Sequence, residues 1–227
     1  MKNYFLKLSL FITLFSLLTT VVVHAQANGA KFFVSWRSEN YVPGWYAGKI
    51  LPSPGSSVII GFELIEGDKA VNITQNEIRW FANDVLFQKG FGLKTVKYAI
   101  PTTRTSNSQK IKIVVGGYKG ADISKFIDIP VASAEVVVPV PYVGGALSPG
   151  KHTLSSLLYF WNIRELFATL LEWSYNGTEI SSAGNNNSLE IEVPATASGG
   201  TLRLSVQATK IGDEATFAKN NAVLLIK

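Results

Sequence analysis

The sequence predicts an all-β protein built from two similar β-sandwich domains in tandem after an N-terminal targeting segment. Downstream of that segment the chain consists of short runs of alternating apolar and polar residues separated by turn residues, without long helical periodicity. A tryptophan motif occurs twice, as IRWFAND at 78–84 and LEWSYNG at 171–177. In both copies the turn pair begins three residues after the tryptophan and a proline follows it after 21 residues, at Pro101 and Pro194. An internal repeat of this length indicates one fold used twice.

Residues 1–27 have the pattern of a signal peptide. Lys2 and Lys7 provide a positive start, an apolar run of 16 residues follows at 8–23, and small residues stand at Ala25 and Ala27. We expect cleavage after one of these alanines, the alternative being an N-terminal membrane anchor that is retained. Either outcome predicts an exported protein of the bacterial periplasm, cell surface or medium, in contact with the membrane only through this segment if it stays uncleaved.

The composition excludes several classes of function. Cysteine is absent, which rules out disulfides, thiolate metal sites and cysteine nucleophiles and suits a bacterial envelope protein stabilised by its cores alone. Removing Lys2 and Lys7 from the 21 basic residues leaves 19 against 16 acidic ones, without a basic run that could follow a phosphate backbone. We therefore predict no nucleic-acid partner.

The first domain is predicted to span residues 28–133. Its expected strands are 31–37, 56–64, 77–82, 110–115 and 126–131, with turns at 66–68, at Asn83-Asp84 and at Gly116-Gly117. Within the tryptophan strand, Ile78 and Trp80 should point to the core and Arg79 to the other face.

The second domain is predicted to span residues 134–227. Its expected strands are 135–138, 153–160, 168–175, 188–193, 201–207 and 222–226, and a short helix across 162–167 is the alternative to a plain connector. The segment LPSPG at 51–55 corresponds to LSPG at 147–150. The linker around 132–135 is short, and with Pro139 and Pro141 after it we expect little freedom between the domains.

Certain residues recur in the two copies and carry a family resemblance. They are Trp80, Asn83, Asp84, Pro101, Ile111, Ile113 and Val115 in the first copy, and Trp173, Asn176, Gly177, Pro194, Leu202, Leu204 and Val206 in the second. This pattern is similar to bacterial immunoglobulin-like domains, with the PKD-like and surface-layer-associated types nearest. The resemblance implies two tandem immunoglobulin-like antiparallel β-sandwiches.

A structural core is expected around the repeated residues. A tryptophan on a central strand fills the space of about 10 Å between two packed sheets and meets aliphatic side chains there. We predict this structural role for Trp80, Trp173, Pro101, Pro194, Ile111, Ile113, Leu202 and Leu204.

The chain offers little that could perform catalysis. His152 is the one histidine after the targeting segment, and the serines near it at 148, 155 and 156 lie outside any nucleophile-elbow pattern. The carboxylates near 63–68, 122–128 and 213–214 lack the spacing of a calcium loop. We predict no enzymatic activity, no metal site and no cofactor.

One loop of the first domain is rich in aromatic residues. Trp36, Tyr41, Trp45 and Tyr46 cluster there, and the segment from Tyr41 to Gly55 is six residues longer than its counterpart from Tyr142 to Gly150. Such rings either pack over the sheet edge and beneath the loop, or form a surface that stacks on sugars or anchors a protein. The sequence thus predicts a structural, adhesion or protein-interaction module of the envelope with a surface-protein partner, the alternative being a carbohydrate-binding module that docks on glycan.

Overall fold

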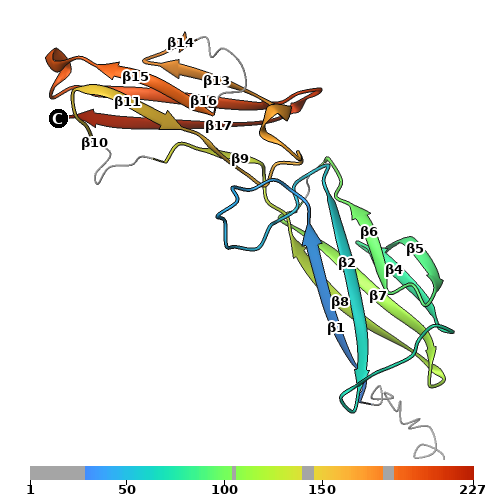
Figure 1. The fold of residues 1–227 in the computed structure, drawn as a ribbon. Helices are drawn as coiled ribbons and strands as arrows, with labels where there is room; N and C mark the ends of the chain where they lie inside the picture. Colours follow the sequence, from blue (N-terminus) through green and yellow to red (C-terminus); the bar gives the residue numbers. More distant parts are fainter. Residues whose placement is uncertain (1–28, 104–105, 140–145, 181–186) are drawn as a thin grey trace, which may run out of the picture.

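The computed structural model describes residues 29–103, 106–139, 146–180 and 187–227. The predicted targeting segment at 1–27 lies outside these residues, as does Pro141. The regular secondary structure of the described residues is almost entirely strand, and its helical elements are two single 3-10 turns, η1 (Leu166–Ala168) and η2 (Ala195–Ala197). No helix in the described ranges combines the length and apolar character needed to cross a bilayer. Figure 1 shows two sandwiches arranged end to end with a bend between them.

The first sandwich packs two antiparallel sheets. One sheet contains β1 (Lys31–Ser38), β2 (Ser57–Glu66), β3 (Lys69–Ala70) and β6 (Thr95–Ala99). The other has the order β5 (Val85–Phe91), β4 (Glu77–Ala82), β7 (Ser108–Tyr118), β8 (Ala121–Pro130). Phe62 on β2 meets Trp80 on β4 edge to face at 5.7 Å between ring centroids, so the aromatic rings join the two sheets across the core.

The second sandwich follows the same plan. Its larger sheet has the order β10 (Ala146–Leu147), β17 (Asp213–Ile226), β16 (Thr201–Lys210), β13 (Thr169–Tyr175), β14 (Thr178–Ile180). Opposite it, β11 (Gly150–Ser155) pairs with β15 (Ser188–Val193), and β12 (Leu157–Tyr159) pairs with β9 (Glu135–Val137). The pairing is antiparallel throughout, except that β10 runs parallel to β17.

The two tryptophan strands occupy equivalent places. β4 lies between β5 and β7, and β13 lies between β14 and β16. Asn83-Asp84 and Asn176-Gly177 each make a two-residue hairpin turn with positive φ at both positions, the geometry that favours Asn and Gly. The internal repeat of the sequence is therefore a structural repeat.

Each sandwich has its own buried core. The first cluster runs from Val58 to Val131 and the second from Val136 to Ile226. The predicted core residues that are buried within these two clusters are Trp80, Ile111 and Ile113 in the first and Trp173, Leu202 and Leu204 in the second. Pro101 and Pro194 are exposed, which corrects their assignment to the core. Both prolines follow the ends of equivalent strands, β6 and β15, where a residue without an N–H cannot extend a ladder.

Several predicted element bounds also need correction. β7 continues through Gly116 and Gly117 as a bulged strand to Tyr118, and the chain turns at Lys119-Gly120, because the Asp122 carboxylate holds the Gly117 N–H at 2.9 Å. The strand predicted at 153–160 is divided at Ser156, because β11 and β12 pair with different partners. β17 begins at Asp213, nine residues before the predicted strand at 222, because pairing with β16 extends it through polar residues. The connector at 162–167 forms only the 3-10 turn η1, which reaches Ala168.

Candidate functional site

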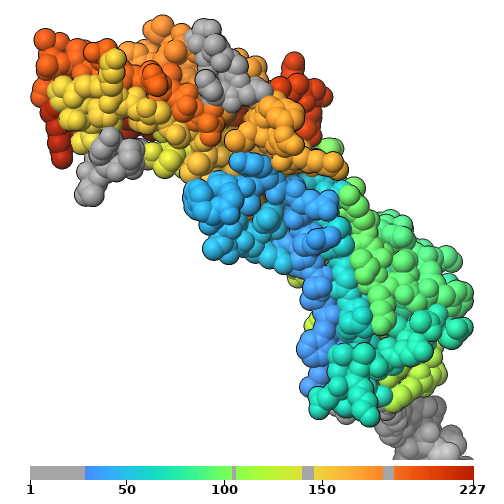
Figure 2. Space-filling view, in the orientation of Figure 1, coloured from blue at the N-terminus to red at the C-terminus, as the bar shows by residue number. Residues whose placement is uncertain are grey.

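The aromatic loop of the first sandwich, residues 39–56 between β1 and β2, contacts the second sandwich. Figure 2 shows this loop against the end of β12 and the segment that follows it. We call the two facing segments, 39–56 and 159–162, the junction. The second segment reads Tyr-Phe-Trp-Asn and has no counterpart of similar composition in the first domain.

Backbone hydrogen bonds join the two sides of the junction. The Tyr41 N–H donates to the Trp161 carbonyl at 2.7 Å, and the Trp161 N–H donates to the Tyr41 carbonyl at 3.3 Å. Tyr41 also packs against the core of the second sandwich, and burial raises the pKa of its phenol. Although Tyr41 belongs to the first domain in sequence, its ring extends the hydrophobic core of the second.

Asn40 is the most highly connected side chain of the junction. It is 5% exposed, and its amide nitrogen donates to the Leu51 carbonyl (3.1 Å), the Ser53 hydroxyl (2.9 Å) and the Phe160 carbonyl (2.9 Å). The first two contacts fold the loop, and the third reaches the other sandwich. A second side-chain contact runs in the opposite direction, because the amide of Asn162 in the second sandwich donates to the Gly55 carbonyl in the loop at 2.9 Å.

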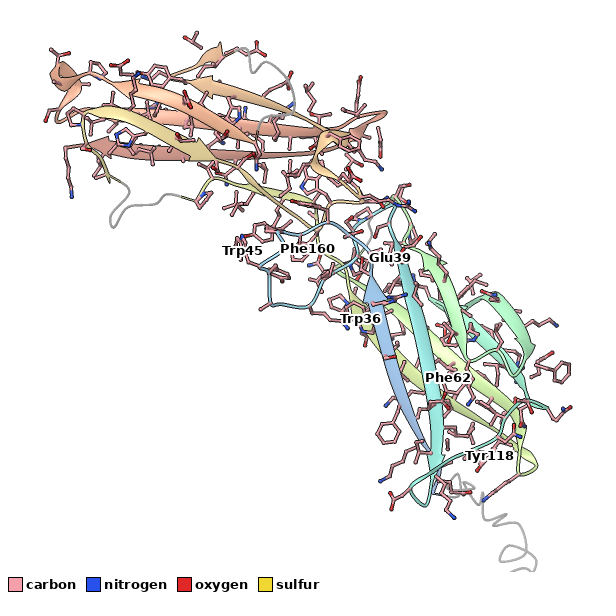
Figure 3. The ribbon with its side chains drawn as sticks, in the orientation of Figure 1. Trp36, Glu39, Trp45, Phe62, Tyr118 and Phe160 are labelled. Atoms are coloured by element: carbon pink, nitrogen blue, oxygen red, sulfur yellow. The ribbon has the colours of Figure 1, made fainter. Side chains whose placement is uncertain are left out.

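Aromatic rings from the two sides of the junction also contact one another. Tyr46 meets Tyr159 and Phe160 edge to face at 5.7 and 5.9 Å, and Trp45 meets Tyr159 at 6.4 Å. Phe160 has φ of +61°, a left-handed conformation that is uncommon for an aromatic residue and indicates that the surrounding contacts hold it. In Figure 3, Trp45 and Phe160 lie close together at the junction.

The four aromatic residues singled out from the sequence have three different environments. Trp36 is half-buried on β1 beneath the ammonium of Lys49, 4.3 Å from its ring centroid. Tyr41 and Tyr46 are half-buried against the second sandwich, whereas Trp45 is 68% exposed. The loop therefore packs its tyrosines and presents one tryptophan to solvent.

Sequence reasoning missed Asn40 and the whole segment 159–162. The density of aromatic residues at 159–161 was a usable signal, but apolar residues in this stretch also fit a strand core. Asn40 gave no signal, because a single asparagine after a strand ordinarily indicates a turn.

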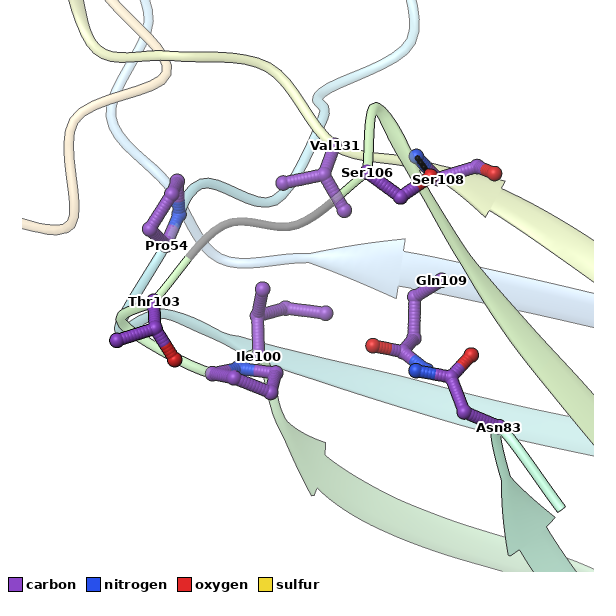
Figure 4. Close-up of a pocket in the computed structure, with 9 residues that line it drawn as sticks. Pro54, Asn83, Ile100, Thr103, Ser106, Ser108, Gln109 and Val131 are labelled. Carbon is purple, nitrogen blue, oxygen red and sulfur yellow. Dashed lines mark hydrogen bonds between the residues drawn. The ribbon is translucent and has the colours of Figure 1, made fainter.

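Two hollows adjoin the junction. A groove lies between Pro54, Thr102, Ala134 and Asn162, and its charged residues, Lys210 and Asp213, already pair with each other at 3.8 Å. Figure 4 shows a smaller hollow at the junction-facing end of the first sandwich, where the amides of Asn83 and Gln109 lie next to each other. Its described lining has no charged side chain. In the groove, the Asp213 carboxylate also accepts a 2.8 Å hydrogen bond from the Thr216 hydroxyl, so two neighbours of the same lining hold this carboxylate.

The other predicted polar residues are placed without forming a reactive cluster. The His152 Nε2 lies 2.7 Å from the Ser148 carbonyl oxygen, a contact typical of a local turn. Across the described residues, the acidic and histidine side chains nowhere group as three potential metal ligands.

Comparison with known proteins adds little beyond the fold. No protein-family model matches the chain, and the search of curated proteins finds no relative. Three structurally similar solved chains are fibronectin(III)-like modules of CbhA from Clostridium thermocellum, three N-terminal domains of the Highly Immunogenic Outer Capsid protein (Hoc) of bacteriophage RB49, and a chimeric titin Z1Z2.

These likenesses are distant. The CbhA modules are 13% identical with a TM-score of 0.31, over 86% of this chain and 94% of theirs. The Hoc domains are 10% identical with a TM-score of 0.46, over 87% and 59%, and titin Z1Z2 is 17% identical with a TM-score of 0.34, over 87% and 96%. At such values the relationships carry no functional information. The strand pairing itself identifies the chain as two immunoglobulin-like β-sandwiches in tandem.

Proposed function

We propose that this protein is a non-enzymatic structural and interaction module, exported to the cell envelope or surface, in which two sandwiches act as one stiff spacer. The observation that carries the proposal is the junction, where the loop that distinguishes the first domain from the second contacts the second domain directly. A spacer needs this property, because two sandwiches on a free linker would not hold a partner at a defined position.

Three kinds of contact support a fixed arrangement. The Tyr41–Trp161 backbone pair and the two asparagine amides provide directional hydrogen bonds, and the rings around Tyr159 contact one another across the junction. Within that arrangement, Tyr41 contributes to the core of the second sandwich. Moving the sandwiches apart would expose this ring and leave the amide of Asn40 without one of its acceptors.

The stiffness of the junction can be measured with spin labels, because the chain has no native cysteine that would also react with the label. Cysteines introduced at the exposed positions Lys125 on β8 and Glu192 on β15 would carry one spin label on each sandwich. We expect a single narrow distance distribution in double electron–electron resonance, and a broader one when Asn40→Asp is added. A broad distance distribution in the protein that keeps Asn40 would contradict the proposal that the two sandwiches form one stiff spacer.

Export and partner binding need separate tests. Fractionation of cells that produce the full chain, with N-terminal sequencing of the exported form, decides between cleavage and a retained anchor. A start at Met1 would exclude cleavage, and recovery from the cytoplasm would exclude export.

Pull-down from the native envelope, compared between wild type and Asn40→Asp, would show whether partner binding depends on a fixed junction.

One observation favours the alternative of carbohydrate binding. The exposed ring of Trp45 is the kind of group that stacks on a sugar. Trp80, Trp161 and Trp173 are fully buried, so a change in tryptophan fluorescence on adding a glycan would come mainly from Trp45 or the half-buried Trp36. A saturable response that Trp45→Ala abolishes and Trp36→Phe keeps would support glycan binding, and no response across a broad panel would remove it.

A further inference from the structure

Exposed apolar side chains gather on the outer face of the second sandwich, at the end where the β16–β17 hairpin turns. They are Leu170 on β13, Ile211 in the hairpin turn and Phe217 on β17, with exposed fractions of 43%, 58% and 60%. A hollow on the same face is lined by these residues together with Glu172, Gln207, Thr209, Lys210, Gly212 and Glu214. Large apolar side chains that stay exposed together on one face, among polar groups, are the kind of surface that a protein partner covers.

Strand register arranges this face into two rows. Leu170 stands opposite Thr209, which stands opposite Phe217, and the row beside it is Glu172, Gln207, Lys219. We call these six residues the outer patch. Their neighbours along the strands, such as Leu171, Val206 and Ala208, point into the core, so the six side chains face away from it. At this level the described sheet is three strands wide, with β16 in the middle.

The two rows are self-complementary. An apolar residue occupies each end of the first row, whereas the second row has a carboxylate at one end and an ammonium at the other. A twofold axis in the plane of contact and running along β16 would place β13 of one copy over β17 of the other. Leu170 would then face Phe217 of the partner copy, and Glu172 would face Lys219, each contact occurring twice.

We propose that the outer patch is a homodimer interface, in which two copies of this chain stack the β13–β16–β17 faces of their second sandwiches. Face-to-face sheets pack with their strands within about 30° of each other, so the axis lies close to β16. The middle strand presents Thr209 and Gln207 at the axis, where short or amide side chains allow close approach and mutual hydrogen bonds.

Charge complementarity favours a second copy over an unrelated partner. Among the described residues, neither Glu172 nor Lys219 has an oppositely charged partner in an ion pair, and the recorded polar contact of Glu172 is a 3.5 Å bond from Gln207. Opposite charges at the two ends of one row satisfy each other under a twofold axis. An acidic or basic partner would match only one end.

Charge exchange tests the interface without disturbing the core. Sedimentation velocity of the full chain, followed from about 10 μM to about 1 mM, should show a concentration-dependent dimer. Glu172→Lys or Lys219→Glu alone would place like charges opposite each other twice per dimer, and each is expected to raise the dimer Kd at least about tenfold. The double variant, Glu172→Lys with Lys219→Glu, restores both pairs with their signs exchanged and should recover the wild-type Kd.

A matched control is Lys125→Glu, which makes the same charge change on β8 of the first sandwich and should leave the Kd unchanged. Circular dichroism of each variant verifies the fold. If the wild-type protein stays monomeric over the whole concentration range, the proposal is overturned, and the outer patch would then be a binding surface for a different protein. A double variant no better than the single ones also overturns it, because recovery requires that the two positions face each other.

Discussion

The side-chain amide of Asn40, in the loop of the first sandwich, donates a 2.9 Å hydrogen bond to the main-chain carbonyl of Phe160, in the second. The same buried nitrogen also holds Leu51 and Ser53 within its own loop. One functional group therefore takes part both in folding the loop and in attaching the second sandwich.

Asn40→Asp is expected to weaken the junction more than its small change in shape suggests. A carboxylate keeps the size of the amide but cannot donate, so the Leu51 and Phe160 carbonyls would face a buried negative charge, and only the Ser53 hydroxyl could turn to donate to it. Asn40→Ala should cost about 1–3 kcal/mol through the acceptors left unpaired, and Asn40→Asp at least as much at neutral pH. Urea denaturation followed by circular dichroism measures both. Equal stability of the three proteins would show that Asn40 has no structural role at the junction.

The two core tryptophans should respond differently to phenylalanine. Replacement by alanine is expected to cost about 3–5 kcal/mol at either site, because a large buried ring leaves a cavity. The Trp80 indole N–H donates to the Leu93 carbonyl at 2.9 Å, whereas that of Trp173 has no partner among the described residues. Trp80→Phe should therefore cost about 1 kcal/mol more than Trp173→Phe. Urea midpoints of the two variants, compared with wild type, decide the order, and a larger cost for Trp173→Phe would contradict it.

Because the two domains repeat the same hairpin turn, the residue found in one turn can be placed in the other and the reverse. Asp84 and Gly177 occupy the same turn position with φ of +64° and +84°, a region where glycine is free of strain. We expect Asp84→Gly to stabilise the first sandwich by about 0.5–1 kcal/mol and Gly177→Asp to destabilise the second by a similar amount. Differential scanning calorimetry of both variants checks the signs, and shifts in the same direction would indicate that something other than backbone conformation dominates.

Acid should loosen the end of the first sandwich farthest from the junction, where Figure 3 places Tyr118. A hydrogen bond from the Gly117 N–H, and then one from Arg79, lower the pKa of Asp122. A hydrogen bond from Lys119 is the main cause that lowers the pKa of Glu66. A carboxylate whose pKa is lower in the folded protein contributes stability above its unfolded pKa, and this contribution is lost as pH falls through the folded value.

Hydrogen exchange measures this effect region by region. Below about pH 4, protection at the β7–β8 turn should decrease before protection of the core strands, after correction for intrinsic rates. Asp122→Asn should weaken the turn at neutral pH and make it less sensitive to acid. Uniform loss of protection across the sandwich would contradict a local effect of these carboxylates.

Alternation and turn chemistry made much of the fold predictable from sequence. Ile78 and Trp80 face the core because side chains alternate along a strand, and Asn83-Asp84 turns the chain because those residues tolerate positive φ. The boundaries that failed depend on strand pairing and side-chain contacts, which the alternation within a single segment does not encode. β17 runs through polar residues because β16 pairs with it along its length, and the Asp122 carboxylate moves the next turn beyond Gly117.

The sequence by itself determined that this chain folds as two copies of one sandwich, because local alternation and turn residues specify strands wherever they stand. It also located the loop in which the copies differ. Only the tertiary structure decided the use of that loop, since the partner of Asn40 is a main-chain carbonyl 120 residues away. Main-chain groups are the same at every residue, so no side-chain pattern identifies Phe160 as the acceptor. The outer patch likewise depends on the register of three strands, which places Glu172 and Lys219 at opposite ends of one row.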